Sequence, residues 1–129
     1  MTFKALVTTK AADALSTSLA AFELDGLMPG SVTVAVEWSA VNYKDGLALS
    51  GSPIMRSFPM IGGIDFAGVV EASDDARYGI GDRVLVNGWG LSQTHHGGYA
   101  QKARVPAEWL IPVPAKFSTR EAMAIGTAG

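Results

Sequence analysis

Short apolar runs separated by turns dominate the chain, which contains 15 glycines and 6 prolines. In residues 32–37, valines alternate with more polar side chains, and this period of two predicts a half-buried β-strand. Residues 15–24 carry a weaker β signal because they are rich in Ser, Thr and Ala. By the same criteria, the pattern predicts further strands over residues 3–9, 66–72, 83–86, 98–105 and 109–113.

Two segments have the pattern of short helices. Residues 43–50 follow Asn42, a good N-cap residue, and place Asp45 in the first helical turn. Residues 118–121 read Ser-Thr-Arg-Glu, a capping box that precedes the apolar residues 122–125. Many short strands with turns between them predict a mainly β fold, either a small barrel or a sandwich, with short helices.

Composition limits the classes of function. The 129 residues fit one domain, and 48% hydrophobic with 17% charged side chains is typical of a globular protein. The net charge of -2 gives no indication of a nucleic-acid or membrane-surface partner. The absence of cysteine excludes disulfides and thiolate metal ligands. The sequence shows neither a signal-peptide pattern nor a run of about 20 apolar residues, so we expect a soluble, cytoplasmic protein.

The segment over residues 39–45 is the most informative candidate for chemistry. It passes from a predicted strand to a predicted helix and ends in the run Asn42, Tyr43, Lys44 and Asp45. A helix N-terminus at the edge of a sheet favours anions and developing negative charge, which makes these side chains candidates for a binding or catalytic site. The alternative is structural: Asn42 and Asp45 cap the helix while Tyr43 packs. The spacing alone favours this alternative.

Other motifs have plainer interpretations. Residues 62–68 form a glycine-rich turn that runs into a strand, which indicates close backbone packing with an aspartate in the turn. His95 and His96 are adjacent, and neighbouring side chains on an extended chain point to opposite faces, so we predict no metal site there. One of them lining a substrate cleft stays a possibility. The chain contains no dinucleotide or phosphate-binding glycine motif and no nucleophile elbow.

Several short motifs follow one another in residues 41–45, 50–51, 58–68, 81–84, 97–100, 112–114 and 125–129. As an ordered set they resemble the N-terminal catalytic domain of the medium-chain dehydrogenase/reductase superfamily. This resemblance implies a GroES-like β-barrel that occupies residues 1–129. Zinc alcohol dehydrogenases have a cysteine ligand where Asn42 stands and Gly-His-Glu where residues 63–65 stand. The resemblance therefore implies a zinc-free branch with no metal.

Within the superfamily, the chain is most similar to the acryloyl-CoA reductase group, through residues 42–45, 56–61, 87–90 and 96–98. The resemblance implies NADPH-dependent reduction of acryloyl-CoA to propionyl-CoA, with hydride passing to the β-carbon of the thioester. It assigns a cofactor contact to Tyr43 and places Asn42 and Asp45 beside it as catalytic residues that position the reactants. Lys44 and Arg56 are candidate contacts for the CoA phosphates, with plain surface charge as the alternative.

Two other functions stay open. One is a quinone or other enone reductase of the same superfamily, and the other is a stand-alone GroES-like binding module without catalysis. The Rossmann domain that binds NADPH in this superfamily is not present in the 129 residues, which stop soon after a helix begins. We therefore expect a truncated piece, inactive alone. The full-length protein is expected to be a homo-oligomer acting on a small-molecule acyl-CoA or enone.

Overall fold

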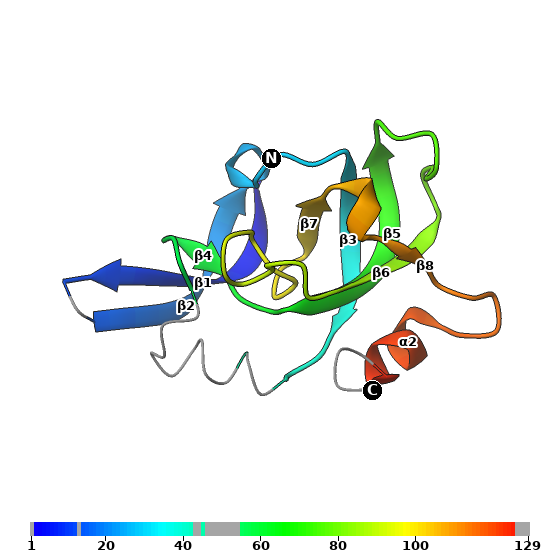
Figure 1. The fold of residues 1–129 in the computed structure, drawn as a ribbon. Helices are drawn as coiled ribbons and strands as arrows, with labels where there is room; N and C mark the ends of the chain where they lie inside the picture. The colour runs from blue at the N-terminus through cyan, green and yellow to red at the C-terminus, as the bar shows by residue number, and fades with distance from the viewer. Residues whose placement is uncertain (1, 13, 43–44, 46–54, 126–129) are drawn as a thin grey trace.

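The computed structural model describes residues 2–12, 14–42, 45 and 55–125 (Figure 1). The longer strands are β1 (Thr2–Ala11), β2 (Ala14–Glu23), β3 (Val32–Ser39), β5 (Asp65–Ser73) and β6 (Arg83–Asn87). The shorter elements are β4 (Met60–Ile61), β7 (Lys102–Val105), β8 (Ile111–Pro112), the 3-10 turns η1 (Leu24–Gly26) and η2 (Ala107–Trp109), and helix α2 (Thr119–Ile125). None of the helices in these ranges is long and apolar enough to cross a bilayer.

The strands form two antiparallel sheets, so the prediction of a mainly β fold is confirmed. One sheet has the order β2-β1-β4 and the other the order β7-β3-β5-β6-β8. Over the described residues, strand pairing does not join the two sheets into a closed barrel. Residues 98–101 run between the sheets. In this segment the Leu6 N–H donates to the Tyr99 carbonyl (2.8 Å), and the Val36 N–H donates to the Gln101 carbonyl (2.9 Å). The segment therefore links the sheets through main-chain hydrogen bonds.

The strand with the weakest sequence signal, β2, forms because β1 pairs with it along its whole length. Their register runs from Thr2 opposite Glu23 to Ala11 opposite Ala14. The two strands extend together to one side of the molecule in Figure 1. Cross-strand pairing thus supplies what the Ser-, Thr- and Ala-rich sequence lacks in intrinsic β preference.

Two predicted strands have different bounds in the structure. The strand expected over residues 98–105 is regular only in β7, because its first half crosses between the sheets. The segment 109–113 holds the end of η2 and the two-residue β8, and β4 was not predicted at all. The helix expected over residues 43–50 lies outside the described residues except for Asp45, which is helical.

Helix α2 confirms the second helix prediction, and its capping box is formed. The Ser118 hydroxyl accepts a hydrogen bond from the Glu121 N–H (3.0 Å), and the Glu121 carboxylate accepts one from the Ser118 N–H (3.0 Å). These two bonds satisfy backbone donors that a helix start otherwise leaves open. Thr119 joins the helix to the large sheet by donating to the Glu37 carboxylate (2.7 Å).

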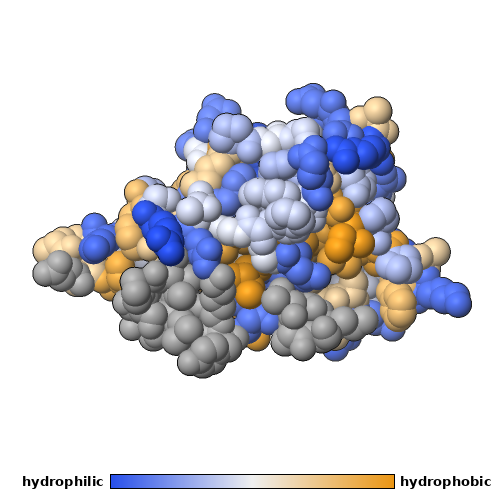
Figure 2. Space-filling view, viewed as in Figure 1, coloured by the Kyte–Doolittle hydropathy of each residue, from blue (hydrophilic) through white to orange (hydrophobic). Residues whose placement is uncertain are grey.

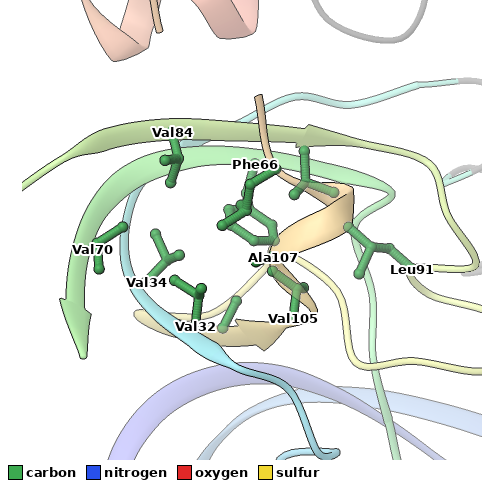
Figure 3. Packing of buried hydrophobic residues seen from close by; sticks show 11 residues of the cluster. Val32, Val34, Phe66, Val70, Val84, Leu91, Val105 and Ala107 are labelled. Carbon is green, nitrogen blue, oxygen red and sulfur yellow. The ribbon is translucent and has the colours of Figure 1, made fainter. Parts of the chain in front are cut away.

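The main core lies inside the five-stranded sheet, where Phe66 is fully buried (Figure 3). Inward-facing side chains of four strands surround it, and Leu91 and η2 complete the enclosure. The core members are Val32, Val34, Phe66, Val70, Val84, Val86, Leu91, Ala103, Val105, Ala107 and Leu110. The alternation read from residues 32–37 therefore selects the buried face of β3, where Val32 and Val34 belong to the core.

Two chain segments, residues 61–63 and 97–98, cross each other at glycines just before β5 begins. The Gly97 N–H donates to the Ile61 carbonyl (2.8 Å), and the Gly98 N–H donates to the Gly63 carbonyl (3.1 Å). A Cβ atom added at Gly97 would lie 2.0 Å from the Gly63 carbonyl oxygen, so only glycine permits this approach. We call residues 61–63 and 97–98 the glycine crossing. It confirms the close backbone packing predicted for residues 62–68 and places Asp65 next to the segment that links the sheets.

Candidate functional site

The candidate site forms where β3 ends and β5 begins. Ser39, the last residue of β3, pairs with Phe66, so Ala40 and Asp65 lie at the same end of the large sheet. The Ala40 N–H donates to the Asp65 carboxylate (3.3 Å), and the Asp65 side chain is fully buried. The aspartate interpreted from sequence as a turn residue is therefore a buried carboxyl group beside the strand-to-helix segment.

Asn42 and Asp45 meet through a local turn. The Asp45 N–H donates to the Asn42 carbonyl (3.0 Å), and the Asp45 carboxylate accepts the Asn42 N–H (2.9 Å). The second oxygen of Asp45 accepts the Ile64 N–H (3.0 Å), which ties this turn to the start of β5. With 1% of its surface exposed, Asp45 is as enclosed as Asp65.

The Asn42 side chain joins the two carboxylates. Its amide Nδ2 lies 3.1 Å from Asp65 Oδ2 and 3.4 Å from Asp45 Oδ2. A carboxylate is an acceptor, so the amide nitrogen and not the amide oxygen must face both groups. Asn42 itself is half-buried. The Asn42 side chain therefore bridges the two buried carboxylates through its amide nitrogen.

Tyr99 is a member of the site that the sequence analysis did not select. Its hydroxyl donates to the Ala40 carbonyl (3.0 Å). Burial raises the pKa of this hydroxyl well above its usual range, and the negative charges of Asp45 and Asp65 raise it further. Tyr99 therefore keeps its proton at neutral pH. The signal that could have selected it is its place in the motif over residues 97–100. We call Ala40, Asn42, Asp45, Asp65 and Tyr99 the Asn42 cluster.

The remaining predicted site residues are not joined to this cluster by any described contact. Tyr43 and Lys44 lie outside the described residues. Arg56 is exposed, and its backbone N–H donates to the Gln93 carbonyl (2.8 Å). An exposed guanidinium is accessible to an anion.

The adjacent histidines point into different parts of the structure, as predicted. His95 Nε2 donates to the Arg104 carbonyl (2.6 Å), and its ring lies edge-on to Trp109. His96 Nδ1 accepts the Ile61 N–H (3.1 Å), and its ring lies edge-on to Phe22. Among the residues that the structure describes, no three His, Cys, Asp or Glu side chains form a group able to hold a metal ion.

His96 should make the stability of the fold depend on pH. Burial lowers its pKa from 6.5 to about 4, because the protonated ring would lose solvation; the charge of His95 lowers it further, and a hydrogen bond with the Gly26 backbone opposes the shift. The unfolded chain binds the proton at the ordinary pKa, so the stabilisation is present above pH 6.5 and is lost as the pH falls toward 4. We expect a loss of about 3 kcal/mol in the free energy of unfolding, measured by denaturant titration across this range.

The variant His96→Asn is the matched control for this pH dependence. The asparagine carbonyl can accept the Ile61 N–H but does not titrate. Its free energy of unfolding should change less than that of the wild type between pH 6.5 and 4. Identical slopes for the two proteins would contradict the assignment to His96.

The surface around the Asn42 cluster is open and partly apolar. Val41, next to Asn42, is 85% exposed, and Trp38 is 45% exposed with the Arg120 guanidinium 5.4 Å from its ring centre. A hollow of about 400 Å³ lies between the sheets, lined by Lys4, Leu19, residues 36–39 and residues 98–101. Figure 2 shows a mainly polar face with apolar side chains near β6 and β8. The Asn42 cluster thus lies next to exposed apolar side chains, Trp38 and Val41.

Comparison with known proteins identifies the class. The alcohol dehydrogenase GroES-like domain pattern matches residues 28–115. The chain therefore belongs to the alcohol dehydrogenase GroES-like domain family, and the predicted GroES-like fold and medium-chain dehydrogenase/reductase membership are confirmed.

Two curated relatives cover nearly the whole chain. It is 51% identical to the acrylyl-CoA reductase AcuI of Ruegeria pomeroyi over 130 residues, which are 98% of this chain and 39% of that protein. It is 41% identical to the putative quinone oxidoreductase YhfP of Bacillus subtilis over 128 residues, again 98% and 39%. The chain thus spans about two fifths of the length of these relatives.

Solved structures agree with this placement. The yhdH oxidoreductase of Salmonella enterica in complex with NADP has a TM-score of 0.94 at 47% identity and covers 98% of this chain and 39% of its own. The Bacillus subtilis yhfP protein with NAD bound has a TM-score of 0.95 at 41% identity and covers 100% of this chain and 40% of its own. Both likenesses extend over the Asn42 cluster, since they span nearly all of the chain.

Proposed function

We propose that the protein containing this chain is an NADPH-dependent enoyl-thioester reductase that converts acryloyl-CoA to propionyl-CoA. The identity of 51% to an acrylyl-CoA reductase over 98% of the chain is the observation that carries the proposal. The likeness to a structure in complex with NADP supports the choice of cofactor. Residues 1–129 are then the catalytic-domain part of the enzyme.

The Asn42 cluster fits the nicotinamide end of such a cofactor better than its phosphates. Ribose hydroxyls and the nicotinamide carboxamide carry hydrogen-bond donors, and the half-buried Asn42 offers a polar group to them. The two buried carboxylates repel phosphate at the same place. When bound, NADPH supplies the hydride that the β-carbon of the thioester accepts, and the α-carbon then takes a proton to complete the reduction.

The residues of this chain then have distinct roles in the proposal. Asn42 and Asp45 position the reactants at the end of β3, and Tyr43 contacts the cofactor. Lys44 and Arg56 are candidate partners for the CoA phosphates, of which only Arg56 is described and it is exposed. Tyr99 keeps its proton and holds the Ala40 carbonyl in place, because its hydroxyl pKa is raised.

A second part of the enzyme must cover this site. Val41 beside Asn42 is 85% exposed, and hydride transfer is served by a site that excludes water. We infer that a nucleotide-binding domain supplies most of the NADPH contacts and closes over the Asn42 cluster. The 129-residue chain alone should then give no measurable turnover.

The test is NADPH oxidation with acryloyl-CoA by the complete protein and by its Asn42→Ala variant. We expect kcat/KM to fall by about 10- to 100-fold, since the variant loses a polar contact to bound reactants. The variant Asp25→Ala, at an exposed position in η1, should behave as wild type. Equal rates for Asn42→Ala and wild type would mean that Asn42 has only a structural role.

A quinone or other enone reductase is the second candidate, because the chain is 41% identical to a putative quinone oxidoreductase over 98% of its length. The same assay separates the two activities. A higher kcat/KM for a benzoquinone than for acryloyl-CoA would favour the second candidate. If neither acryloyl-CoA nor a benzoquinone supports NADPH oxidation, both enzyme functions are refuted and the binding-module alternative is left.

A further inference from the structure

We propose that Asp65, acting with Asp45, is a positioning residue that turns the Asn42 amide so that its carbonyl oxygen faces the bound reactants. Asn42 then recognises a hydrogen-bond donor, a hydroxyl or an N–H, and does not stabilise the enolate oxygen that forms during hydride transfer. This inference rests on the proposed function for the identity of the reactants. The orientation of Asn42 itself stands on geometry alone.

Both hydrogens of the Asn42 amide are engaged by carboxylates. Nδ2 carries two hydrogens, and acceptors lie at 3.1 Å on Asp65 and at 3.4 Å on Asp45. The amide group is planar, so its oxygen points away from the side on which both carboxylates lie. A flipped amide would set its oxygen against two anions and would lose both hydrogen bonds.

The two carboxylates are themselves held by the main chain and cannot turn freely. The other oxygen of Asp65 accepts the Ala40 N–H (3.3 Å), and the other oxygen of Asp45 accepts the Ile64 N–H (3.0 Å). Exposed fractions of 0% and 1% place both side chains inside the protein. Backbone anchoring at the ends of β3 and β5 therefore fixes the direction of the Asn42 amide before any ligand arrives.

This arrangement decides what Asn42 can do in the reaction. An enolate oxygen is stabilised by hydrogen-bond donors, but the donors of Asn42 already point at buried anions. The remaining oxygen is an acceptor, which suits a ribose hydroxyl or carboxamide of NADPH or an amide N–H of the CoA thioester. The enolate oxygen must then meet donors other than Asn42.

The kinetic test uses Asp65→Asn in the complete protein, with Asp74→Asn as the control. Asp74 is exposed and directly follows the other end of the same strand, β5. The new amide at position 65 can donate to the Asn42 oxygen, so the fixed direction is lost. We expect the KM of one reactant to rise about tenfold with kcat changed by less than about threefold. A rise for NADPH places the donor on the cofactor, and a rise for acryloyl-CoA places it on the thioester.

The orientation is tested separately by NMR with ¹⁵N-labelled asparagine. In the complete protein, the side-chain signals that disappear in Asn42→Ala are those of Asn42. In the wild type we expect both Asn42 side-chain hydrogens to exchange slowly with solvent, and in Asp65→Asn we expect their signals to move. The wild-type measurement stands even where Asp65→Asn does not fold.

Two results would overturn the inference. Fast exchange of the Asn42 amide hydrogens in the wild type would show that the carboxylates do not hold them. A loss confined to kcat in Asp65→Asn would show that the amide acts on the transition state and not on a bound donor. If the wild-type protein oxidises NADPH with neither acryloyl-CoA nor a benzoquinone, but its Asn42 amide hydrogens exchange slowly, the proposed function is refuted and the orientation of Asn42 stands.

Discussion

Gly97→Ala is expected to destabilise the fold severely. The added Cβ would lie 2.0 Å from the Gly63 carbonyl oxygen and 2.5 Å from that of Gly62, and both are backbone atoms. The two segments would have to separate, which breaks the hydrogen bond from the Gly97 N–H to Ile61 (2.8 Å). Overpacking of this kind costs about 3 kcal/mol or more in the free energy of unfolding. Urea unfolding followed by circular dichroism measures the loss.

Gly79→Ala is the matched control for this substitution. A Cβ at Gly79 meets nothing within 4 Å, and this glycine does not have a positive φ. Its free energy of unfolding should stay within about 0.5 kcal/mol of the wild type. If Gly97→Ala were as stable as Gly79→Ala, the glycine crossing would not be the close contact described here.

Phe66→Ala is expected to cause the second large loss. Phe66 is fully buried at the centre of the main core, between β3, β6 and η2 (Figure 3). Removing its ring loses the transfer free energy of the side chain and leaves a cavity that the surrounding strands fill only in part. Such substitutions cost about 3–5 kcal/mol. The midpoint of urea unfolding should fall while the slope of the transition stays unchanged.

Phe117→Ala tests whether the effect belongs to burial and not to the loss of an aromatic ring. Phe117 is 39% exposed, and its carbonyl bond to the Arg83 guanidinium (2.5 Å) comes from the backbone, so the variant keeps it. We expect a loss below about 1 kcal/mol. Equal losses at the two positions would contradict the assignment of Phe66 to the centre of the core.

The sequence predicts β3 well because the alternation over residues 32–37 reports one buried face. Val32 and Val34 of β3 and Val84 and Val86 of β6 all point into the core. β4 could not be predicted, because a two-residue strand has too few positions to show a period. The irregular course of residues 98–101 follows from contacts with two different sheets, which no local pattern reports.

The candidate site was predictable only where its members are near each other in sequence. Asn42 and Asp45 lie three positions apart, and the helix-start pattern selected both. Asp65 lies 23 positions beyond Asn42, and Tyr99 lies 59 positions beyond Ala40, so only the fold brings them together. Asp65 looked like a turn residue because its burial depends on the glycine crossing, which is a long-range contact.

The glycine crossing also has a consequence for how this family can vary. Tyr99 reaches the Asn42 cluster directly from the crossing, where its N–H donates to the Gly62 carbonyl (3.0 Å) and its hydroxyl to Ala40. A substitution that shifts the glycine crossing would therefore displace Tyr99 from the Asn42 cluster and weaken the junction of the two sheets at the same time. The residues of the crossing should accumulate changes far more slowly than their exposed neighbours.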